Sequence, residues 1–411
     1  MKRVLLVAVT AALVAAAPAA AFTPADPLAA KQWYLAEDHA FDAWATPPPT
    51  LAPVKVAIID SGVDNTLPDF AGRIADAKSF VGGSPFLDTE GHGTFVAGEI
   101  AANLDSTGIV GMAYASQLLV AKVVRPDESI PLTAEAAAIR WAADDGAQVI
   151  NLSLGGLRDP LHPNSDYYSP LEASAIAYAV KKGVVIVAAV GNSDEAPSSP
   201  WNYASYPAAL PHVIGVSALT RTGAVADFSN RDPIFNDISA PGVGIFSTFP
   251  LALTQLRPSC PDQGYSDCGG NDYLNAEGTS FAAPQVSAAA AMLFAVDPAL
   301  TSSQVAAILE QTADDVNATN GCAQCAVGRD RFSGAGRLDV ARAIAALQGP
   351  LPAPDKYETN DDAGADAWQL WGKTIPVTAS IDYYDDPVDV YKVAIAPGEQ
   401  LKAKLTANWP G

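Results

Sequence analysis

The chain has 411 residues, of which 49% are hydrophobic and 17% are charged. A long disordered chain is poorer in apolar residues, so the composition excludes disorder as a general description. At about 150 residues per domain, the length suggests two or three domains. The formal net charge is −21, from 24 Lys and Arg against 45 Asp and Glu. Because phosphate binding needs clustered Lys and Arg, this balance argues against nucleic acid as the main partner.

The first 21 residues have the pattern of a secretory signal peptide. Lys2 and Arg3 supply positive charge, residues 4–17 form an apolar run, and alanines 19–21 form a small-residue cleavage site. The run is short for a bilayer, and no later stretch approaches the roughly 18 apolar residues that a spanning helix needs. The sequence therefore predicts a secreted protein with no membrane contact after signal removal, and a membrane anchor is the alternative.

If the protein is exported, its four cysteines are expected to form disulfides, because an oxidising compartment favours them. They are Cys260, Cys268, Cys322 and Cys325, and four cysteines allow three connectivities. We predict the two local pairs, Cys260 with Cys268 and Cys322 with Cys325. A four-cysteine zinc site is the alternative, although the seven residues between Cys260 and Cys268 are poor ligand spacing.

After an N-terminal arm over 22–53, residues 54–348 alternate between short apolar runs and helical stretches. The predicted strands are rich in Val, Ile and Leu without polar alternation, as in a parallel sheet buried on both faces: 54–59, 118–124, 149–154, 184–190 and 213–218. Predicted helices include 133–145 and 170–182, the second closed by Gly183. This alternation predicts right-handed crossovers and an α/β three-layer sandwich with a mainly parallel central sheet.

The end of the chain differs in composition. A proline-rich stretch over 349–356 is predicted to be a stiff linker, and residues 401–407 alternate strictly, as a half-exposed strand does. Residues 357–411 are therefore expected to start a β domain of sandwich type. Because about 55 residues fall short of the roughly 100 that a seven-strand sandwich takes, we expect it to be truncated or to pair its edges elsewhere.

Two polar side chains stand at element boundaries. Asp60 follows the first buried strand, and in an open α/β sheet the carboxyl ends of strands border the ligand crevice. His92 lies between Gly91 and Gly93 at the start of a predicted helix, and glycines let the backbone approach other groups closely. Each also has an ordinary interpretation, since Asp is common in turns and an isolated His is usually a satisfied polar residue.

Two further polar residues have similar settings. Ser280 is predicted at a helix N-terminus, where free N–H groups and the helix dipole favour developing negative charge. Asn192 follows the strand over 184–190, and its amide could donate a hydrogen bond to an oxyanion. An ordinary serine N-cap and a local Asn turn are the alternatives.

In chain order, Asp60, His92 and Ser280 have the order of the subtilisin catalytic triad. The motifs around these residues and Asn192 closely resemble those of the subtilisin-like serine peptidases (subtilases). The resemblance covers about 26–348 and extends to residues 151–156, 228–230, 240–242 and 334–339. It implies a catalytic domain over 54–348 that hydrolyses peptide bonds in extended polypeptides through an acyl-enzyme intermediate.

The resemblance also implies a role for each residue of the triad. Ser280 is the nucleophile, His92 takes its proton and returns it to the leaving amine, and Asp60 holds the imidazole tautomer. Asn192 and the backbone N–H of Ser280 bind the oxyanion. Because His92 must be neutral to act as base, activity is expected to rise as the pH passes about 6 to 7, near the ordinary imidazole pKa.

For substrate binding, the resemblance implies that 123–126 and 153–156 flank an extended peptide as edge strands. The predicted substrate-binding residues are Ser153, Leu154, Gly155 and Gly156, with Ala188, Ala189 and Val190 lining an apolar S1 pocket. Hydrogen bonds to the substrate main chain do not distinguish between side chains, so we expect broad specificity. The apolar S1 residues favour an apolar or aromatic residue at P1.

The loop over 103–109 resembles the calcium loop of the family. The resemblance implies that oxygen ligands for Ca²⁺ come from the side chains of Asp69 and Asp105, the backbone carbonyls of Asn103, Thr107 and Ile109, and Asp26 near the mature N-terminus. A solvated acidic turn is the alternative.

Only about 30 residues separate Ala21 from Val54, so we expect no inhibitory folding domain of the kind subtilases commonly carry between signal and catalytic domain. The tail from Tyr357 resembles the bacterial pre-peptidase C-terminal domain. Two alternatives to a broad endopeptidase stay open: a dedicated processing peptidase or peptide cyclase with the same triad, and a non-catalytic binding protein on a subtilase scaffold.

Overall fold

The computed structural model describes residues 22–44, 52–254, 272–349, 357, 367–372, 374–379 and 389–406. The predicted signal peptide, the linker beyond Gly349 and the pair Cys260 and Cys268 lie outside these residues.

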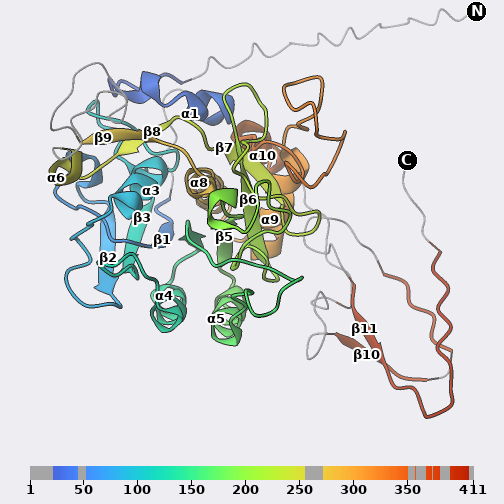
Figure 1. The fold of residues 1–411 in the computed structure, drawn as a ribbon. Helices are drawn as coiled ribbons and strands as arrows, with labels where there is room; N and C mark the ends of the chain where they lie inside the picture. Colours follow the sequence, from blue (N-terminus) through green and yellow to red (C-terminus); the bar gives the residue numbers. More distant parts are fainter. Residues whose placement is uncertain are drawn as a thin grey trace, which may run out of the picture.

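A seven-stranded parallel sheet forms the centre of the protein, in the order β2-β3-β1-β4-β5-β6-β7 (Figure 1). Its strands are β1 (Lys55–Asp60), β2 (Ile74–Ser79), β3 (Gln117–Lys122), β4 (Val149–Leu152), β5 (Val185–Ala189), β6 (Val213–Leu219) and β7 (Ile238–Pro241). The five predicted strands correspond to β1, β3, β4, β5 and β6, so the prediction of a parallel α/β sheet is confirmed. The sequence did not indicate β2 and β7.

Helices cover both faces of this sheet (Figure 1). Helices α3 (His92–Ala101) and α8 (Ala283–Val296) pack on one face, and α4 (Leu132–Asp144) and α5 (Pro170–Lys181) on the other. The other helices of the described residues are α1 (Trp33–Glu37), α2 (Ala40–Ala43), α6 (Leu251–Thr254), α9 (Ser302–Thr312) and α10 (Val340–Ala346). Helix α5 begins where predicted, because the Ser169 hydroxyl accepts a hydrogen bond from Glu172 N and Pro170 suits the first turn.

The inner strands of the sheet are mostly apolar because the two faces of the sheet belong to two cores. In β1, Val56 and Ile58 pack in the core with α3 and α8, whereas Ala57 and Ile59 pack in the core with α4 and α5. Successive strand side chains point to opposite faces, so a strand buried on both sides needs apolar residues at every position. This arrangement is the three-layer sandwich that the sequence predicted.

The centre of the first core is the apolar segment Thr279–Val296, which contains α8. Among the described residues it is the one helical segment long and apolar enough to cross a membrane, so the expectation that no later stretch approaches a spanning helix is wrong here. The segment is nevertheless 83% buried inside the protein. Its hydropathy therefore reflects a core position between α3, α9 and the sheet.

The N-terminal arm packs on the same core. Tyr34 and Leu35 of α1 are fully buried, and Trp44 makes edge contacts with Phe41 and Tyr114. A two-stranded antiparallel sheet, β8 (Ile245–Thr248) with β9 (Tyr273–Ala276), lies beyond α3.

At the other end of the chain, β10 (Trp368–Leu370) and β11 (Tyr391–Val393) form a separate parallel pair. The prediction of a strand over 401–407 is wrong for its described part, because residues 401–406 form no strand and are all exposed. An alternating sequence forms a strand only beside a neighbour that accepts its backbone hydrogen bonds, and no strand among the described residues pairs with this segment.

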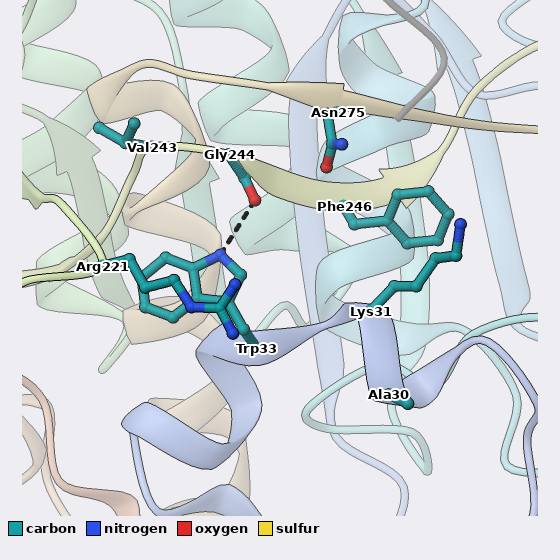
Figure 2. A pocket seen from close by; sticks show the side chains of 8 residues that line it. All are labelled: Ala30, Lys31, Trp33, Arg221, Val243, Gly244, Phe246 and Asn275. Carbon is teal, nitrogen blue, oxygen red and sulfur yellow. Dashed lines mark hydrogen bonds between the residues drawn. The ribbon is translucent and has the colours of Figure 1, made fainter. Parts of the chain in front are cut away.

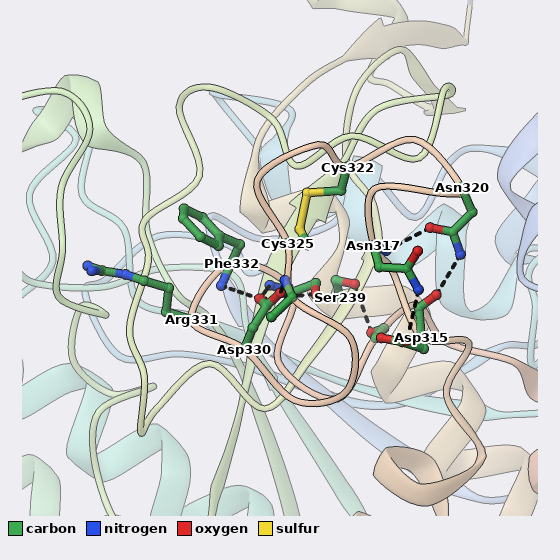
Figure 3. Close-up of a disulfide and its surroundings, with 12 residues drawn as sticks. Ser239, Asp315, Asn317, Asn320, Cys322, Cys325, Asp330, Arg331 and Phe332 are labelled. Atoms are coloured by element: carbon green, nitrogen blue, oxygen red, sulfur yellow. Dashed lines mark hydrogen bonds between the residues drawn. A yellow bond between two sulfur atoms is a disulfide. The ribbon is translucent and has the colours of Figure 1, made fainter.

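Cys322 and Cys325 form a disulfide, as predicted (Figure 3). Both cysteines are buried against Leu219, Val225 and Phe332 in a small core of their own. Because these two sulfurs are bonded to each other, the alternative of a four-cysteine zinc site is wrong.

Candidate active site

Asp60 and His92 are joined by hydrogen bonds at the carboxyl end of the sheet. His92 Nδ1 lies 2.8 Å from Asp60 Oδ1 and 3.0 Å from Oδ2, and Asp60 Oδ1 also accepts from Ser61 N at 2.7 Å. Asp60 ends β1 and is buried, whereas 29% of the His92 side chain is exposed. A buried carboxylate thus holds one imidazole nitrogen, which leaves Nε2 on the opposite side of the ring as the atom that can exchange a proton.

The two glycines beside His92 allow the start of α3 to approach β1 closely. Gly91 has φ of +84°, which a residue with a side chain rarely adopts. A Cβ on Gly93 would lie 2.2 Å from the carbonyl oxygen of Gly62 and 3.1 Å from Asp60 Cβ. A larger residue at Gly93 would therefore push the start of α3 away from Asp60, and one at Gly91 would collide with the Phe249 ring.

Asp88 organises the turn before α3, and the sequence motifs did not single it out. Its carboxylate accepts from Glu90 N (3.1 Å), Gly91 N (2.8 Å), Thr94 N (2.9 Å), Thr94 Oγ1 (2.6 Å) and Ser61 Oγ (2.9 Å). These contacts satisfy N–H groups that the first turn of a helix leaves without internal partners. The only signal in the sequence is an acidic residue shortly before a helix start.

Ser280 lies on a short 3-10 turn, Thr279–Phe281, directly before α8. Its hydroxyl donates to the carbonyl oxygen of Ser153 at 3.1 Å, and Ser153 Oγ donates to the Ser280 carbonyl at 2.6 Å. The ring of Phe281, the next residue, lies 5.3 Å from the His92 ring. The fold therefore brings the turn of Ser280 beside His92, and Ser153 holds this turn by two hydrogen bonds.

Asn192 follows β5 and contacts the same turn. Its Oδ1 accepts from Thr279 N at 3.1 Å and from Thr279 Oγ1 at 3.0 Å. Because the amide oxygen is held by these two donors, the Nδ2 group is the end of the side chain that can donate to another molecule.

The predicted substrate-binding residues fall into two groups. Ser153 is buried, Leu154 and Gly156 are half-buried and Gly155 is exposed, and Gly156 is bonded to Tyr206 through both backbone groups at 2.8 and 2.9 Å. Ala188, Ala189 and Val190 are buried and pack in the cores on either side of β5. That these three line an apolar S1 pocket stays a prediction.

The surroundings of His92 alter its titration. Burial alone lowers the pKa of His92, but the charge and hydrogen bond of Asp60, with added effects from Asp88 and Glu90, raise it to about 9. Burial, with the nearby charge of Asp60, also raises the pKa of Glu90. Because three carboxylates favour the imidazolium, we expect activity to rise at a higher pH than the ordinary imidazole pKa indicates, and the pH profile stays a prediction.

The predicted calcium residues lie close together around 103–109. Asp26 Oδ1 accepts from Asp105 N and Ser106 N, both at 3.1 Å, and Asp69 Oδ1 accepts from Ile109 N at 3.2 Å. Asp26 Oδ2 is buried without a hydrogen-bond partner among the described residues. Burial, with the nearby charge of Asp105, raises the pKa of both Asp26 and Asp69.

The remaining predicted ligands of this loop make local contacts. Asn103 N donates to the Asp69 carbonyl at 2.9 Å, and Thr107 N donates to Asp105 Oδ1 at 3.0 Å. These bonds occupy N–H groups and leave the carbonyls of Asn103, Thr107 and Ile109 as oxygen donors. The unpartnered oxygen of Asp26 lies in the same loop region as the carboxylates of Asp69 and Asp105. No basic side chain is among the groups that act on the pKa of Asp26 or Asp69, so this arrangement suits a bound cation.

A different trio, His39, Asp314 and Asp339, has ligand atoms that all lie within 4.8 Å of one another in the described part of the chain. Arg337 Nη2 lies 2.9 Å from Asp314, and Arg342 Nε lies 2.7 Å from Asp339. Because two arginines already balance these carboxylates, the trio is an ion-pair network that joins α2 to α10.

A pocket of about 300 Å³ lies away from these residues, between the N-terminal arm and β8 (Figure 2). Trp33 Nε1 donates to the Gly244 carbonyl at 2.9 Å, Arg221 lies 5.4 Å from the Trp33 ring centre, and Lys31 lies 5.3 Å from that of Phe246. The pocket contains none of the predicted site residues, and its contacts attach the arm to the sheet.

This fold and site define the class of protein. The sequence profile of the subtilase family of peptidases matches residues 52–336, more than half of the chain, so the chain belongs to the subtilase family. It is a subtilisin-like serine endopeptidase, a hydrolase.

Three relatives illustrate the similarity. Subtilisin DY from Bacillus licheniformis is 35% identical over 270 residues, which are 64% of this chain and 85% of that protein. A protease from Pseudoalteromonas arctica has a TM-score of 0.62 and 26% identity, covering 79% of this chain and 99% of that one. Fervidolysin from Fervidobacterium pennivorans, a keratinolytic enzyme related to subtilisin, has a TM-score of 0.62 and 30% identity, covering 80% of this chain and 47% of that one.

Proposed function

We propose that this chain is a secreted endopeptidase of broad specificity that uses Asp60, His92 and Ser280 as its catalytic triad. The observation that carries the proposal is the pair of hydrogen bonds, 2.8 and 3.0 Å, by which buried Asp60 holds His92 Nδ1. A neutral imidazole held at Nδ1–H presents Nε2 as an acceptor, which is the tautomer that a general base needs.

The reaction begins with Ser280. Its hydroxyl rotates from the Ser153 carbonyl toward His92, Oγ attacks the peptide carbonyl carbon, and the proton passes to Nε2. The imidazolium gives this proton to the leaving amine as the C–N bond breaks, and Asp60 stabilises its positive charge. Water then attacks the acyl-enzyme, loses a proton to His92 and releases the acid, and Ser280 regains its proton.

Asn192 and the Ser280 N–H donate to the negative oxygen that develops on the substrate carbonyl. Thr279 orients the Asn192 amide by holding its oxygen, so that Nδ2 is committed as a donor before the substrate binds. A donor fixed in advance needs no reorganisation in the transition state.

The substrate extends along residues 153–156 as an added strand, with exposed Gly155 open to the peptide backbone. Apolar or aromatic P1 residues bind beside Ala188, Ala189 and Val190. Because main-chain bonds dominate, many sequences are cleaved.

A structural Ca²⁺ ion is held by Asp26, Asp69 and Asp105 together with the carbonyls of Asn103, Thr107 and Ile109. The unpartnered buried oxygen of Asp26 supports this assignment. The ion supplies positive charge to a cluster of three carboxylates and stabilises only the folded chain.

The domain organisation belongs to the same proposal. Residues 1–21 direct secretion, 22–53 form an arm on the catalytic domain over 54–348, and 349–356 link it to the start of a C-terminal β domain over 357–411. The apolar run over 4–17 after Lys2 and Arg3 supports secretion.

Digestion of casein followed by peptide mapping tests the proposal. We expect cleavage at many bonds, most often after apolar or aromatic residues, and no cleavage by the Ser280→Ala variant. One altered bond in one peptide would favour a processing peptidase or cyclase, and strict cleavage after paired basic residues would contradict the apolar S1 pocket. No cleavage of any substrate by the wild-type chain would favour a binding protein on this scaffold.

A further inference from the structure

Two buried polar residues connect the helix of His92 to the turn of Ser280. Glu99 lies on α3, seven residues after His92, and Gln285 lies on α8, five residues after Ser280. Both are fully buried, and Gln285 Nε2 lies 3.2 Å from Glu99 Oε2. Neither belongs to the triad, and neither is used in the steps above.

Gln285 fixes the backbone beside the nucleophile. Its Nε2 lies 2.7 Å from the carbonyl oxygen of Phe281, the residue after Ser280, and 2.7 Å from that of Pro241 at the end of β7. A backbone hydrogen bond makes a second connection, because Gly278 N, just before the turn, donates to the carbonyl of Gly242, just after β7, at 2.8 Å. The Ser280 turn is thus held to β7 on both sides, once by Gln285 and once by the backbone.

Counting hydrogens gives the protonation state of Glu99. An amide nitrogen carries two hydrogens, and the two shortest contacts of Gln285 Nε2 go to carbonyl oxygens. Glu99 Oε1 and Gln285 Oε1 are both buried without a partner among the described residues, so this pair has more acceptors than hydrogens. A proton on Glu99 supplies the missing donor.

The charges around Glu99 agree with a neutral acid. Burial raises the pKa of Glu99 well above its ordinary value, the Gln285 bond opposes this, and the charge of Asp38 adds to the rise. The ionisable side chains acting on Glu99 or affected by it are Asp38 and Tyr34, and burial raises the pKa of both. Among the described residues no basic side chain acts on the pKa of Glu99, whereas Arg337 acts on that of Asp38.

We propose that Glu99 and Gln285 form an uncharged bridge that keeps the helix of His92 in register with the turn of Ser280. Both are positioning residues, and this role rests on the proposed function of His92 and Ser280. The bridge works beside the packing of Phe95 on Phe281, whose ring centres are 4.4 Å apart. Apolar packing tolerates sliding, whereas directional hydrogen bonds fix the register of the two elements.

Four variants test the bridge: Glu99→Gln, Glu99→Leu, Gln285→Leu and the matched control Gln32→Leu. Gln32 is also a buried amide, and its hydrogen bonds go to Tyr34 Oη and to the backbone of Val110, which belong to neither α3 nor the Ser280 turn. Kinetics on a soluble peptide substrate, thermal unfolding and the pH dependence of kcat/KM are measured for each.

We expect Glu99→Leu and Gln285→Leu to lower kcat about 10- to 100-fold with KM changed less than about twofold, because a misplacement near 1 Å costs up to about 100-fold. Glu99→Gln, which keeps an uncharged polar group, is expected to retain kcat and the wild-type pH profile. Gln32→Leu is expected to lower Tm while kcat stays within about twofold. If the two leucine variants lower Tm as the control does but leave kcat unchanged, the bridge is only structural and the proposal is wrong.

The protonation of Glu99 has a readout that needs no turnover. The His92 imidazole is titrated by NMR in the wild type and in Glu99→Gln, and we expect the same pKa in both. A lower pKa in Glu99→Gln means that Glu99 carries a charge, which contradicts an uncharged bridge. A wild-type chain with no peptidase activity would instead overturn the proposed function, and the titration would still decide the charge of Glu99.

Discussion

Two groups of carboxylates in this protein differ in how many of their oxygens have hydrogen-bond partners within the protein. Beside His92, Asp88 accepts five hydrogen bonds, and Asp60 is bonded to both His92 and Ser61 N. In the loop over 103–109, Asp26 keeps a buried oxygen without a partner, and the pKa of Asp26 and Asp69 is raised by burial and by Asp105. The carboxylates of the first group are hydrogen-bonded within the protein, whereas the unpartnered oxygen in the second suits the cation that we propose there. We therefore expect damage to the first to remove catalysis and damage to the second to remove stability.

The largest expected effect on kcat comes from removing the Ser280 hydroxyl, which the proposal makes the nucleophile activated by His92. Ser280→Ala is expected to lower kcat about 10⁶-fold, a magnitude taken from subtilisin, which belongs to the same family. The Tm should change little, because the hydroxyl makes one hydrogen bond, to the Ser153 carbonyl. Steady-state kinetics and a melting curve check both statements. More than a hundredth of wild-type activity in this variant would rule out Ser280 as nucleophile.

A matched pair of substitutions then separates the two clusters. Asp60→Asn is expected to lower kcat about 10⁴-fold, because the amide favours the wrong imidazole tautomer. Asp69→Asn, the same change in the second cluster, is expected to lower Tm while kcat at 25 °C stays within about twofold. If Asp69→Asn also abolished activity at a temperature where the variant is folded, the proposed division of roles would fail.

The oxyanion donor has the next effect in size. Asn192→Ala is expected to lower kcat about 10²- to 10³-fold with little change in KM, because its hydrogen bond strengthens only as charge develops. The control is Asn202→Ala, since Asn202 is exposed and its side chain accepts a hydrogen bond from Arg331. Equal losses in both variants would show that Asn192 has no special part in the reaction.

Removing the cation addresses the second cluster directly. A ligand at about 100 times its Kd stabilises the fold by roughly 2.7 kcal/mol. At about 2–4 °C per kcal/mol for a domain somewhat smaller than this one, EDTA should lower Tm by about 5–10 °C. Calorimetry with and without EDTA measures the shift, and added Ca²⁺ should reverse it. No shift would retire the calcium site.

The smallest expected effect concerns the pH profile. His92 acts as base when neutral, so kcat/KM should rise with pH and reach half its maximum near pH 9, the pKa of about 9 that Asp60 and its neighbours impose. Glu90→Gln removes one of the anions that raise this pKa, so the profile should move to lower pH. A profile that is flat from pH 5 to 9 would count against His92 as the base.

The raised pKa of His92 also makes the stability of the fold depend on pH, and stability falls where activity is expected to rise. A histidine whose folded pKa is raised from 6.5 to about 9 stabilises the fold fully below pH 6.5 and loses that contribution as the pH rises through 9. Activity and stability should therefore diverge between these values, and Glu90→Gln should reduce the divergence.

The sequence predicted the elements whose residues are buried on both sides. Strands such as β1 and β5 are continuous apolar runs because each faces two helix layers. The edge strand β2 was missed because several of its residues are exposed and polar, and β7 because it has only four residues. The prediction of a strand from the alternating pattern over 401–406 was wrong, because alternation indicates a strand only where a neighbouring strand pairs with it.

The candidate site divides in the same way. Asp60, His92, Ser280 and Asn192 could be predicted because each follows a strand or begins a helix within a recognisable motif, and their catalytic roles stay a proposal. Asp88, Glu99 and Gln285 were missed because their roles depend on contacts across the fold, such as the 3.2 Å approach of Gln285 to Glu99 over 186 positions of sequence. The raised pKa of His92 could not be predicted from the sequence, because the carboxylates around His92 become its neighbours only when the chain is folded.

The most direct test of the triad is the reaction of Ser280 with a fluorophosphonate, with the modified residue identified by peptide mass spectrometry. We predict that Ser280 alone is labelled, that the rate rises with pH toward about 9, and that His92→Ala slows labelling by at least about 10³-fold. Labelling at another residue, or an unchanged rate in His92→Ala, would contradict the account.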